Sequence, residues 1–365
     1  MNRSRLLAGG IGLITALCLL GSAGAVSPAS AKTGKAKQQQ RPLYWGAWIG
    51  SQITGTQPPW DMSAVTQFET MTGKGLSLIE FSAPFADCKQ PPCTYYRFPT
   101  GEMEAVRAYG AIPFFSWSSA GRTGIEEPDF RLANLIAGAH DPYIRSFAEA
   151  ARNWGHPFFL RFNWEMNGNW FPWSEGVNGN GRGEYVAAWR HVRDIFTSVG
   201  ATNATWVWCP YADPRGRFKP LRPLYPGDAY VDWTCLDGFN WARSPANPAA
   251  WMSFGEIFRR TYRQIVTRIA PRKPMLLAEF ASTGGGRAKA AWIRNMFKLL
   301  RTEFRRIRGL IWFNQIDRGT NWPLESSPAA ARAFRQGVRR GYRPNIYSGL
   351  TGSPIPPSGR IAARP

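Results

Sequence analysis

Eight short apolar and aromatic runs recur along the chain, and segments with helical spacing separate them. The runs cover 43–50, 76–84, 111–117, 157–165, 203–210, 231–241, 275–282 and 309–315. Such near-continuous apolar runs are typical of strands that are buried on both faces of a parallel sheet. Between them, 141–155 and 183–200 repeat apolar residues at helical intervals and end at glycine. Eight strand–helix repeats predict an α/β protein with a single-domain (β/α)8 fold, the TIM barrel. An open doubly wound sheet is the main competitor, but no glycine-rich phosphate loop follows 43–50.

The two ends of the chain differ from this pattern. Residues 1–31 combine basic residues, a short apolar run and small residues, which predicts a secretory signal peptide. A leucine before Cys18 argues against a lipoprotein signal. Residues 32–41, "KTGKAKQQQR", predict a flexible polar tether. The barrel domain then runs over 42–345, and we expect the Pro-, Gly- and Ser-rich tail at 346–365 to stray from it.

Cysteine usage fits export from the cell. Without Cys18, four cysteines remain. Cys88 and Cys93 bracket a short prolyl loop, whereas Cys209 and Cys235 follow two strand-like runs and can bridge neighbouring strands. We predict these two disulfides, with reduced, merely packed pairs as the alternative. The spacing does not suit zinc and only three histidines exist, so we expect neither a metal nor a cofactor.

The chain is strongly basic, with a formal net charge of +21. Such a charge raises the question of a nucleic-acid partner. The arginines are scattered over helix-like stretches, however, which favours solvated helix faces and no nucleic-acid partner. Adhesion to anionic cell-wall polymers is a secondary hypothesis. After the signal peptide no stretch is long and apolar enough to span a bilayer, so we expect no further membrane contact. We also expect a monomer.

Two glutamates lie at the ends of predicted strands. In a (β/α)8 barrel the catalytic groups project from the C-terminal ends of the strands. Glu165 has aromatic neighbours, and burial among them keeps a carboxyl group protonated. Glu279 precedes the polar segment "STGGG", whose backbone donors can stabilise a negative charge. One protonated and one ionised carboxyl group can together hydrolyse a glycosidic bond.

The alternative for either glutamate is a structural carboxylate paired with an arginine. Arg161 lies four residues before Glu165 on the same predicted strand and is the candidate partner. We interpret Glu80 and Asp237 as structural.

Aromatic and amide side chains near the same strand ends suit a carbohydrate. Sugar rings present C–H faces that stack on flat aromatic surfaces with a polar handle. We expect such platforms at Trp170, Trp173 and Trp312. Amides that can bind sugar hydroxyl groups are Asn163, Asn167, Asn240 and Asn314.

The motif "RFNWEMNGNWFPW" at 161–173, followed by "LLAEFAST" and "GLIWFNQ", resembles glycoside hydrolase family 26. The resemblance covers about 44–322 and implies a retaining (β/α)8 glycosidase with its catalytic domain at 42–345. It implies that Glu165 is the acid/base and Glu279 the nucleophile. It also implies that Trp170 and Trp312 line the sugar sites. The family acts mostly on β-1,4-mannan, with members that act on mixed-linkage β-glucan or β-1,3-xylan.

The chain departs from the family pattern at two positions. Trp164 stands where many family mannanases carry histidine, and Phe239 stands where a tyrosine often holds the nucleophile. Both departures bear on which sugar is bound. The full set of expected substrate-binding residues is Arg161, Asn163, Trp164, Trp170, Trp173, Phe239, Asn240, Trp241 and Trp312.

These observations predict a secreted retaining endo-β-glycanase. Its partner is a polysaccharide or oligosaccharide, either β-1,4-mannan or mixed-linkage β-glucan. The two carboxyl groups should lie about 5–5.5 Å apart, the separation of retaining enzymes. The alternative function is non-catalytic carbohydrate binding on a glycosidase barrel.

Overall fold

The computed structural model describes residues 43–358, apart from 243, 248, 285 and 351. The predicted signal peptide at 1–31 and the tether at 32–41 therefore lie outside the described residues.

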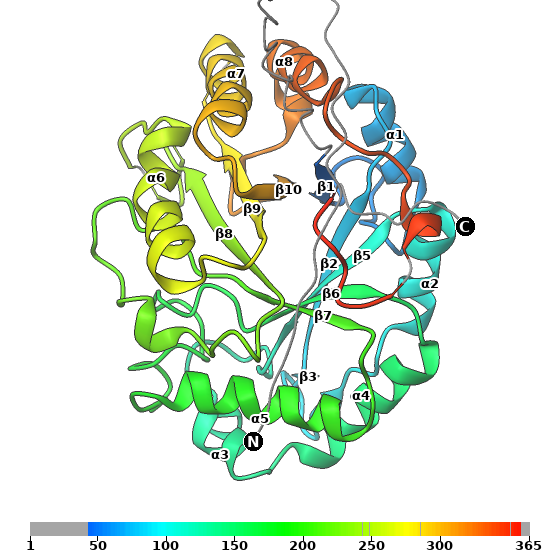
Figure 1. Cartoon of the computed structure of the whole chain (residues 1–365), viewed down its shortest axis with the longest axis vertical. Helices are drawn as coiled ribbons and strands as arrows, with labels where there is room; N and C mark the ends of the chain where they lie inside the picture. Colours follow the sequence, from blue (N-terminus) through cyan, green and yellow to red (C-terminus); the bar gives the residue numbers. More distant parts are fainter. Residues whose placement is uncertain (1–42, 243, 248, 285, 351, 359–365) are drawn as a thin grey trace, which may run out of the picture. The chain divides into compact units, whose positions relative to one another are not determined.

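Eight parallel strands form a closed barrel in the order β1-β10-β9-β8-β7-β6-β5-β2, with β2 pairing back onto β1 (Figure 1). This confirms the predicted (β/α)8 barrel. The strands are β1 (Tyr44–Ile49), β2 (Leu78–Pro84), β5 (Ile112–Ser118), β6 (Phe158–Phe162), β7 (Ala204–Trp208), β8 (Trp233–Asn240), β9 (Met275–Ser282) and β10 (Ile307–Asn314).

Helices surround the barrel strands in Figure 1. They are α1 (Ser63–Thr72), α2 (Thr100–Tyr109), α3 (Leu132–Ile136), α4 (Asp141–Trp154), α5 (Glu184–Ser198), α6 (Phe254–Gln264), α7 (Gly286–Thr302) and α8 (Pro328–Val338). Two short antiparallel ladders lie in the connecting loops: β3 (Ala86–Asp87) with β4 (Thr94–Tyr95), and β11 (Ile316–Asp317) with β12 (Thr320–Asn321). Within the described residues, no helix combines the length and the apolar character that crossing a bilayer requires.

The core has two layers, because successive side chains of a strand point to opposite faces. On β10, Ile311 belongs to the inner cluster that fills the barrel. Its neighbours Leu310 and Trp312 belong to the outer cluster between the strands and the helices. A difference of one residue therefore decides whether a side chain near the strand end can reach the open mouth of the barrel.

The described part of the C-terminal tail, 346–350 and 352–358, packs against the barrel, so the prediction that the tail strays is wrong for these residues. Its Ile355 is only 1% exposed and belongs to the inner cluster. The N–H of Ile355 donates to Thr205 Oγ1 at 2.8 Å, and its carbonyl accepts from Trp233 Nε1 at 2.8 Å. Thr205 and Trp233 lie near the N-terminal ends of β7 and β8, so the tail covers this end of the barrel. The Pro, Gly and Ser content on which the prediction rested did not reveal the few apolar side chains that anchor the tail.

Both predicted disulfides are present. Cys88 and Cys93 close the short loop between β3 and β4, while Cys209 and Cys235 connect the end of β7 to β8 in the barrel interior.

Candidate active site

Glu165 lies in a tight turn after β6, not within the strand as predicted. The strand ends at Phe162, and both Asn163 and Glu165 have positive φ angles, +43° and +55°. Residues with a Cβ rarely adopt this left-handed region, and such backbone strain is found mostly at functional sites. The N–H of Glu165 donates to the carbonyl of Cys209 at 2.7 Å, which anchors the turn to the end of β7.

The Glu165 carboxyl group is held in a nearly dry environment. The residue is 6% exposed, and its Oε2 accepts from Trp170 Nε1 at 2.5 Å. Burial raises the pKa of Glu165 well above its ordinary value, and the charges of Asp237 and Glu279 raise it further. Glu165 therefore favours its protonated form.

A β-bulge turns Glu279 toward the barrel mouth. Leu236 and Gly238 of β8 pair with Leu277 and Phe280 of β9. An interval of two residues on β8 therefore lies opposite an interval of three residues on β9. Leu277 and Phe280 both point to the outer cluster. Strict alternation would place Glu279 on the same outer face as Leu277. The extra residue changes this register, and Glu279 lines the cavity at the mouth instead.

Arg161 on β6 holds the Glu279 carboxylate. Its Nη2 donates to Glu279 Oε1 and contacts Glu80 Oε1 at 2.6 Å, while Nη1 donates to Asp237 Oδ2 at 2.8 Å. The N–H of Glu279 donates to Asp237 Oδ1 at 2.9 Å. The interpretation of Arg161 as the partner of Glu165 is wrong, because its guanidinium group binds these other three carboxylates. Its predicted substrate contact is wrong as well, since Arg161 is 0% exposed.

Two of the carboxyl groups around Arg161, those of Glu80 and Asp237, have raised pKa values. Burial raises the pKa of Glu80 well above its ordinary value and that of Asp237 to about 7, although Arg161 opposes both shifts. Burial disfavours the guanidinium charge too, yet Glu80, Glu279 and Asp237 raise the pKa of Arg161. Glu80 and Asp237 are buried and do not line the cavity, in keeping with the structural role predicted for them.

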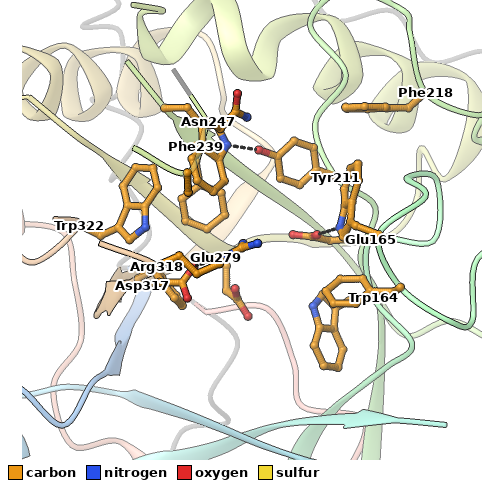
Figure 2. A pocket seen from close by; sticks show the side chains of 15 residues that line it. Trp164, Glu165, Tyr211, Phe218, Phe239, Asn247, Glu279, Asp317, Arg318 and Trp322 are labelled. Atoms are coloured by element: carbon orange, nitrogen blue, oxygen red, sulfur yellow. Dashed lines mark hydrogen bonds and ion pairs between the residues drawn. The ribbon is translucent and has the colours of Figure 1, made fainter. Parts of the chain in front are cut away.

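Glu165 and Glu279 line one cavity of about 530 Å³ at the C-terminal ends of the strands (Figure 2). Most of its wall is aromatic. The lining residues are Trp164, Glu165, Trp170, Phe171, Tyr211, Phe218, Phe239, Trp241, Ala246, Asn247, Glu279, Phe313, Asp317, Arg318 and Trp322. Of the nine predicted substrate-binding residues, four line this cavity: Trp164, Trp170, Phe239 and Trp241.

The predicted amide contacts are wrong, because these side chains are buried and bonded within the protein. Asn163 Oδ1 accepts from the N–H of Ser119 at 2.9 Å, and Asn240 Nδ2 donates to Ser282 Oγ at 3.0 Å. Asn167 and Asn314 are likewise buried and hold loop backbone through their side chains.

Two predicted tryptophan platforms do not reach this cavity. Trp312 is 0% exposed and packs in the outer layer against Phe280, Trp292 and Phe334. Because side chains alternate along β10, its neighbour Phe313 takes the cavity-facing position. Trp173 is nearly buried; its Nε1 donates to the carbonyl of Trp164 at 2.7 Å, and it supports that wall from behind.

Several cavity residues were not singled out from the sequence. Tyr211, just after β7, accepts a hydrogen bond from Trp241 Nε1 at 2.9 Å. Trp322 lies just after β12, and its ring centroid is 5.0 Å from that of Phe239. The others are Phe171, Phe218, Ala246, Asn247, Phe313 and Arg318. Most lie in loops, where the sequence has no strand or helix periodicity to show which side chains face the cavity. The aromatic residues at 211 and 322 were the sequence feature that could have indicated a sugar-binding wall.

A second hollow of about 970 Å³ continues from the first, because Trp164 and Phe171 line both. It lies over the ends of β2 and β5 and includes Trp173. At its rim Trp60 is 53% exposed, and its Nε1 donates to Glu102 Oε1 at 3.1 Å. The two hollows are therefore neighbours at the mouth of the barrel.

One group of potential metal ligands occurs among the described residues: Cys209, Cys235 and Asp237. The two sulfurs are joined in a disulfide and offer no thiolate.

Comparisons with known proteins point to one family of glycosyl hydrolases. Residues 134–282 match the sequence model of glycosyl hydrolase family 26. Endoglucanase H from Acetivibrio thermocellus is 32% identical over 301 residues, which make up 82% of this chain but 31% of that relative. The chain therefore spans less than a third of the length of this curated relative.

Solved structures share the fold. The Bacillus subtilis mannanase man26 has a TM-score of 0.60 and 17% identity, with 88% of this chain and 92% of that chain covered. A double mutant of the Cellulomonas fimi endo-β-1,4-mannanase has a TM-score of 0.62 and 20% identity, with 88% and 74% covered. The resemblance inferred from the sequence motifs is confirmed, and the identities to these structures are low enough that they show the fold alone.

Proposed function

We propose that the protein is a secreted retaining endo-β-glycanase, on the premise that its residues 134–282 match the model of glycosyl hydrolase family 26. The observation that carries the proposal is the pairing of Glu165 and Glu279 in one cavity with opposite surroundings. Glu165 is desolvated and its pKa is raised. Glu279 touches the Arg161 guanidinium group.

In the first step, protonated Glu165 gives its proton to the glycosidic oxygen while the bond between that oxygen and the anomeric carbon breaks. The Glu279 carboxylate attacks the anomeric carbon from the other face and forms a covalent glycosyl ester. The oligosaccharide that contains the protonated oxygen leaves.

In the second step, Glu165 is ionised and takes a proton from a water molecule. The resulting hydroxide equivalent attacks the anomeric carbon, and the ester bond to Glu279 breaks. Two inversions leave the anomeric configuration unchanged, and both carboxyl groups return to their starting states.

The neighbouring residues suit these roles. Arg161 supplies the contact to the nucleophile that Phe239 cannot make, because a phenyl ring has no hydroxyl group. Trp170 orients the Glu165 carboxyl group through its indole N–H. The aromatic wall excludes water, which favours the neutral form of Glu165 before the proton is transferred.

Endo action is supported by the second hollow beside the catalytic cavity. A polymer that enters through the second hollow passes Trp164 and Phe171 before it reaches the two carboxyl groups. Exposed Trp60 at the far rim offers a flat face for a distant sugar ring. A cleft that is open on this side accommodates internal bonds of a chain.

The substrate is a neutral β-glycan, either mixed-linkage β-glucan or β-1,4-mannan. The name of the Acetivibrio relative supports a glucan, and the names of the structural neighbours support a mannan. Trp164 in place of the histidine of many family mannanases favours testing the glucan first. Secretion is supported by the N-terminal sequence pattern and by the two disulfides.

A hydrolysis screen tests the function. The mature protein is incubated with lichenan, mannan, xylan and cellulose, and the anomer of the first product is read by NMR. We expect cleavage of at least one β-glycan with retention of the β-anomer and a mixture of internal fragments. Binding without any cleavage would favour the non-catalytic carbohydrate-binding function, and an α-anomer would contradict the retaining mechanism.

A further inference from the structure

Helix α7 buries a lysine behind the catalytic cavity. Lys289 is 0% exposed, and its Nζ donates to the carbonyls of Trp322 at 2.6 Å and Pro323 at 2.7 Å and to Ser326 Oγ at 3.1 Å. Burying an ammonium group is costly unless it is well bonded. The cost is visible in its pKa, which burial lowers to about 7 while Glu325 acts in the opposite direction. The cost of burying Lys289 behind the cavity suggests that its ammonium group has a specific role.

The segment that Lys289 holds forms a wall of the cavity. Trp322 lines the cavity, and its ring centroid lies 5.0 Å from Phe239 and 4.9 Å from Trp241, two other wall residues. Figure 2 shows Trp322 across the cavity from Trp164 and Phe218.

The segment after Trp322 has only short regular structure, the 3-10 turn at Leu324–Ser326. Another anchor is Asn314 at the end of β10, which accepts from the N–H of Leu324 at 2.8 Å and donates to Glu325 Oε2 at 2.9 Å. Asn314 holds the segment after Pro323, whereas Lys289 holds the two carbonyls next to the tryptophan itself.

The Trp312 ring completes this support. Lys289 Nζ lies 5.8 Å from its centroid, within the range of a cation–π contact. Trp312, which does not line the cavity, thus lies beside the cation that holds Trp322, which does.

We propose that Lys289 is a positioning residue for the active-site cavity, whose ammonium group fixes the carbonyls of Trp322 and Pro323 and so holds the Trp322 indole in the sugar-binding wall. An ammonium group suits this task because its three donors reach three separate oxygens. Charge-assisted bonds also hold them more firmly than a neutral side chain does. This inference rests on the proposed function, since it assigns the wall that contacts the glycan.

The test compares Lys289→Met, which keeps the length of the side chain but removes its donors, with Lys298→Met on an exposed position of the same helix. We expect Lys289→Met to raise KM for the polysaccharide about tenfold, the equivalent of roughly one charge-assisted hydrogen bond, while kcat stays within about twofold. Amide hydrogen exchange in peptides covering 320–327 should quicken in Lys289→Met and not in Lys298→Met. If Lys289→Met fails to fold, Ser326→Ala removes one acceptor and should quicken exchange in the same peptides to a smaller extent.

The outcomes separate the two proposals. If the wild type cleaves no glycan, the proposed function fails, but exchange at 320–327 and oligosaccharide binding still test Lys289. Unchanged exchange and unchanged KM in Lys289→Met would overturn the positioning role. So would a uniform increase in exchange over the whole chain with no KM effect, because that result marks a merely structural lysine.

Discussion

The two ends of the same barrel are built in opposite ways. At the C-terminal end of the strands, loops leave a hollow cleft that contains two glutamates, and the backbone at Glu165 is in the left-handed region. At the N-terminal end, the tail lays Ile355 and Tyr347 against the inner cluster. One end buries groups that would be more stable in water, and the other buries apolar side chains.

The contrast teaches where stability and activity are located in this protein. Carboxylates around a single guanidinium group reduce stability, because desolvating charges costs free energy that pairing only partly returns. Apolar burial at the sealed end contributes in the opposite sense. Substitutions at the open, C-terminal end of the strands should therefore mainly change catalysis. Substitutions at the sealed, N-terminal end should mainly change the free energy of unfolding.

The largest expected effect comes from Glu279→Ala at the open end. Without the nucleophile no glycosyl ester forms, and we expect kcat to fall about 10⁴-fold or more. Thermal stability should not fall, because one of the crowded carboxylates is removed while Glu80 and Asp237 still pair with Arg161. Reducing-sugar release and a thermal melt measure the two quantities. Retained binding of the polysaccharide is the control, and full activity would break the assignment of the nucleophile.

The converse effect is expected from Ile355→Ala at the sealed end. Truncating a fully buried isoleucine typically costs about 2–4 kcal/mol of the free energy of unfolding. Because Ile355 contacts the strand starts and not the cleft, kcat and KM should stay within about twofold of wild type. Urea unfolding and steady-state kinetics test both statements.

Ile125→Ala, at an exposed position, is the matched control for this truncation and should change neither quantity. A loss of activity in folded Ile355→Ala would show that the two ends are coupled.

A smaller effect concerns the pH dependence of stability. The pKa of Glu165 is raised in the folded state, so its contribution is fully present below the unfolded pKa of about 4.3. That contribution is lost as the pH rises through the higher folded pKa. Relative to wild type, Glu165→Gln should therefore gain stability between the low and high ends of this window.

Urea unfolding of Glu165→Gln and wild type across this pH range makes the measurement. Parallel curves for the two proteins would contradict the assignment of Glu165 as the proton-holding carboxyl group.

The smallest expected effect lies at the far rim of the cleft. Trp60→Ala should raise KM for a long polysaccharide about three- to tenfold, because a stacking contact contributes roughly 1 kcal/mol. KM for a short oligosaccharide that spans only the two carboxyl groups should not change. Trp60→Phe, which keeps a flat ring, should recover part of the loss. Equal increases in KM for long and short substrates would instead assign Trp60 to the part of the cleft next to the two carboxyl groups.

Much of the architecture was predictable from local patterns. The eight apolar runs coincide with the eight barrel strands, and the Asp-Pro start and glycine end of 141–155 correspond to α4. Cysteine positions predicted both disulfides. The motif around Glu165 predicted the family.

Which side chains face the mouth of the barrel was less predictable, since a shift of one residue along a strand reverses the face to which a side chain points. Trp312 and Phe313 are both aromatic, and nothing local says which of them faces the cavity. The bulge in β9 that redirects Glu279 arises from its pairing with β8 and β10.

The sequence by itself determined the strand–helix order, the family motif, and the two glutamates as candidates, because these depend on residues close together in the chain. Only the tertiary structure decided that Arg161 holds Glu279, that the tail seals the barrel, and that Trp322, held by Lys289, completes the cavity wall. Each of these contacts joins residues from distant parts of the chain. Their partners are set by how the barrel closes and not by any local period.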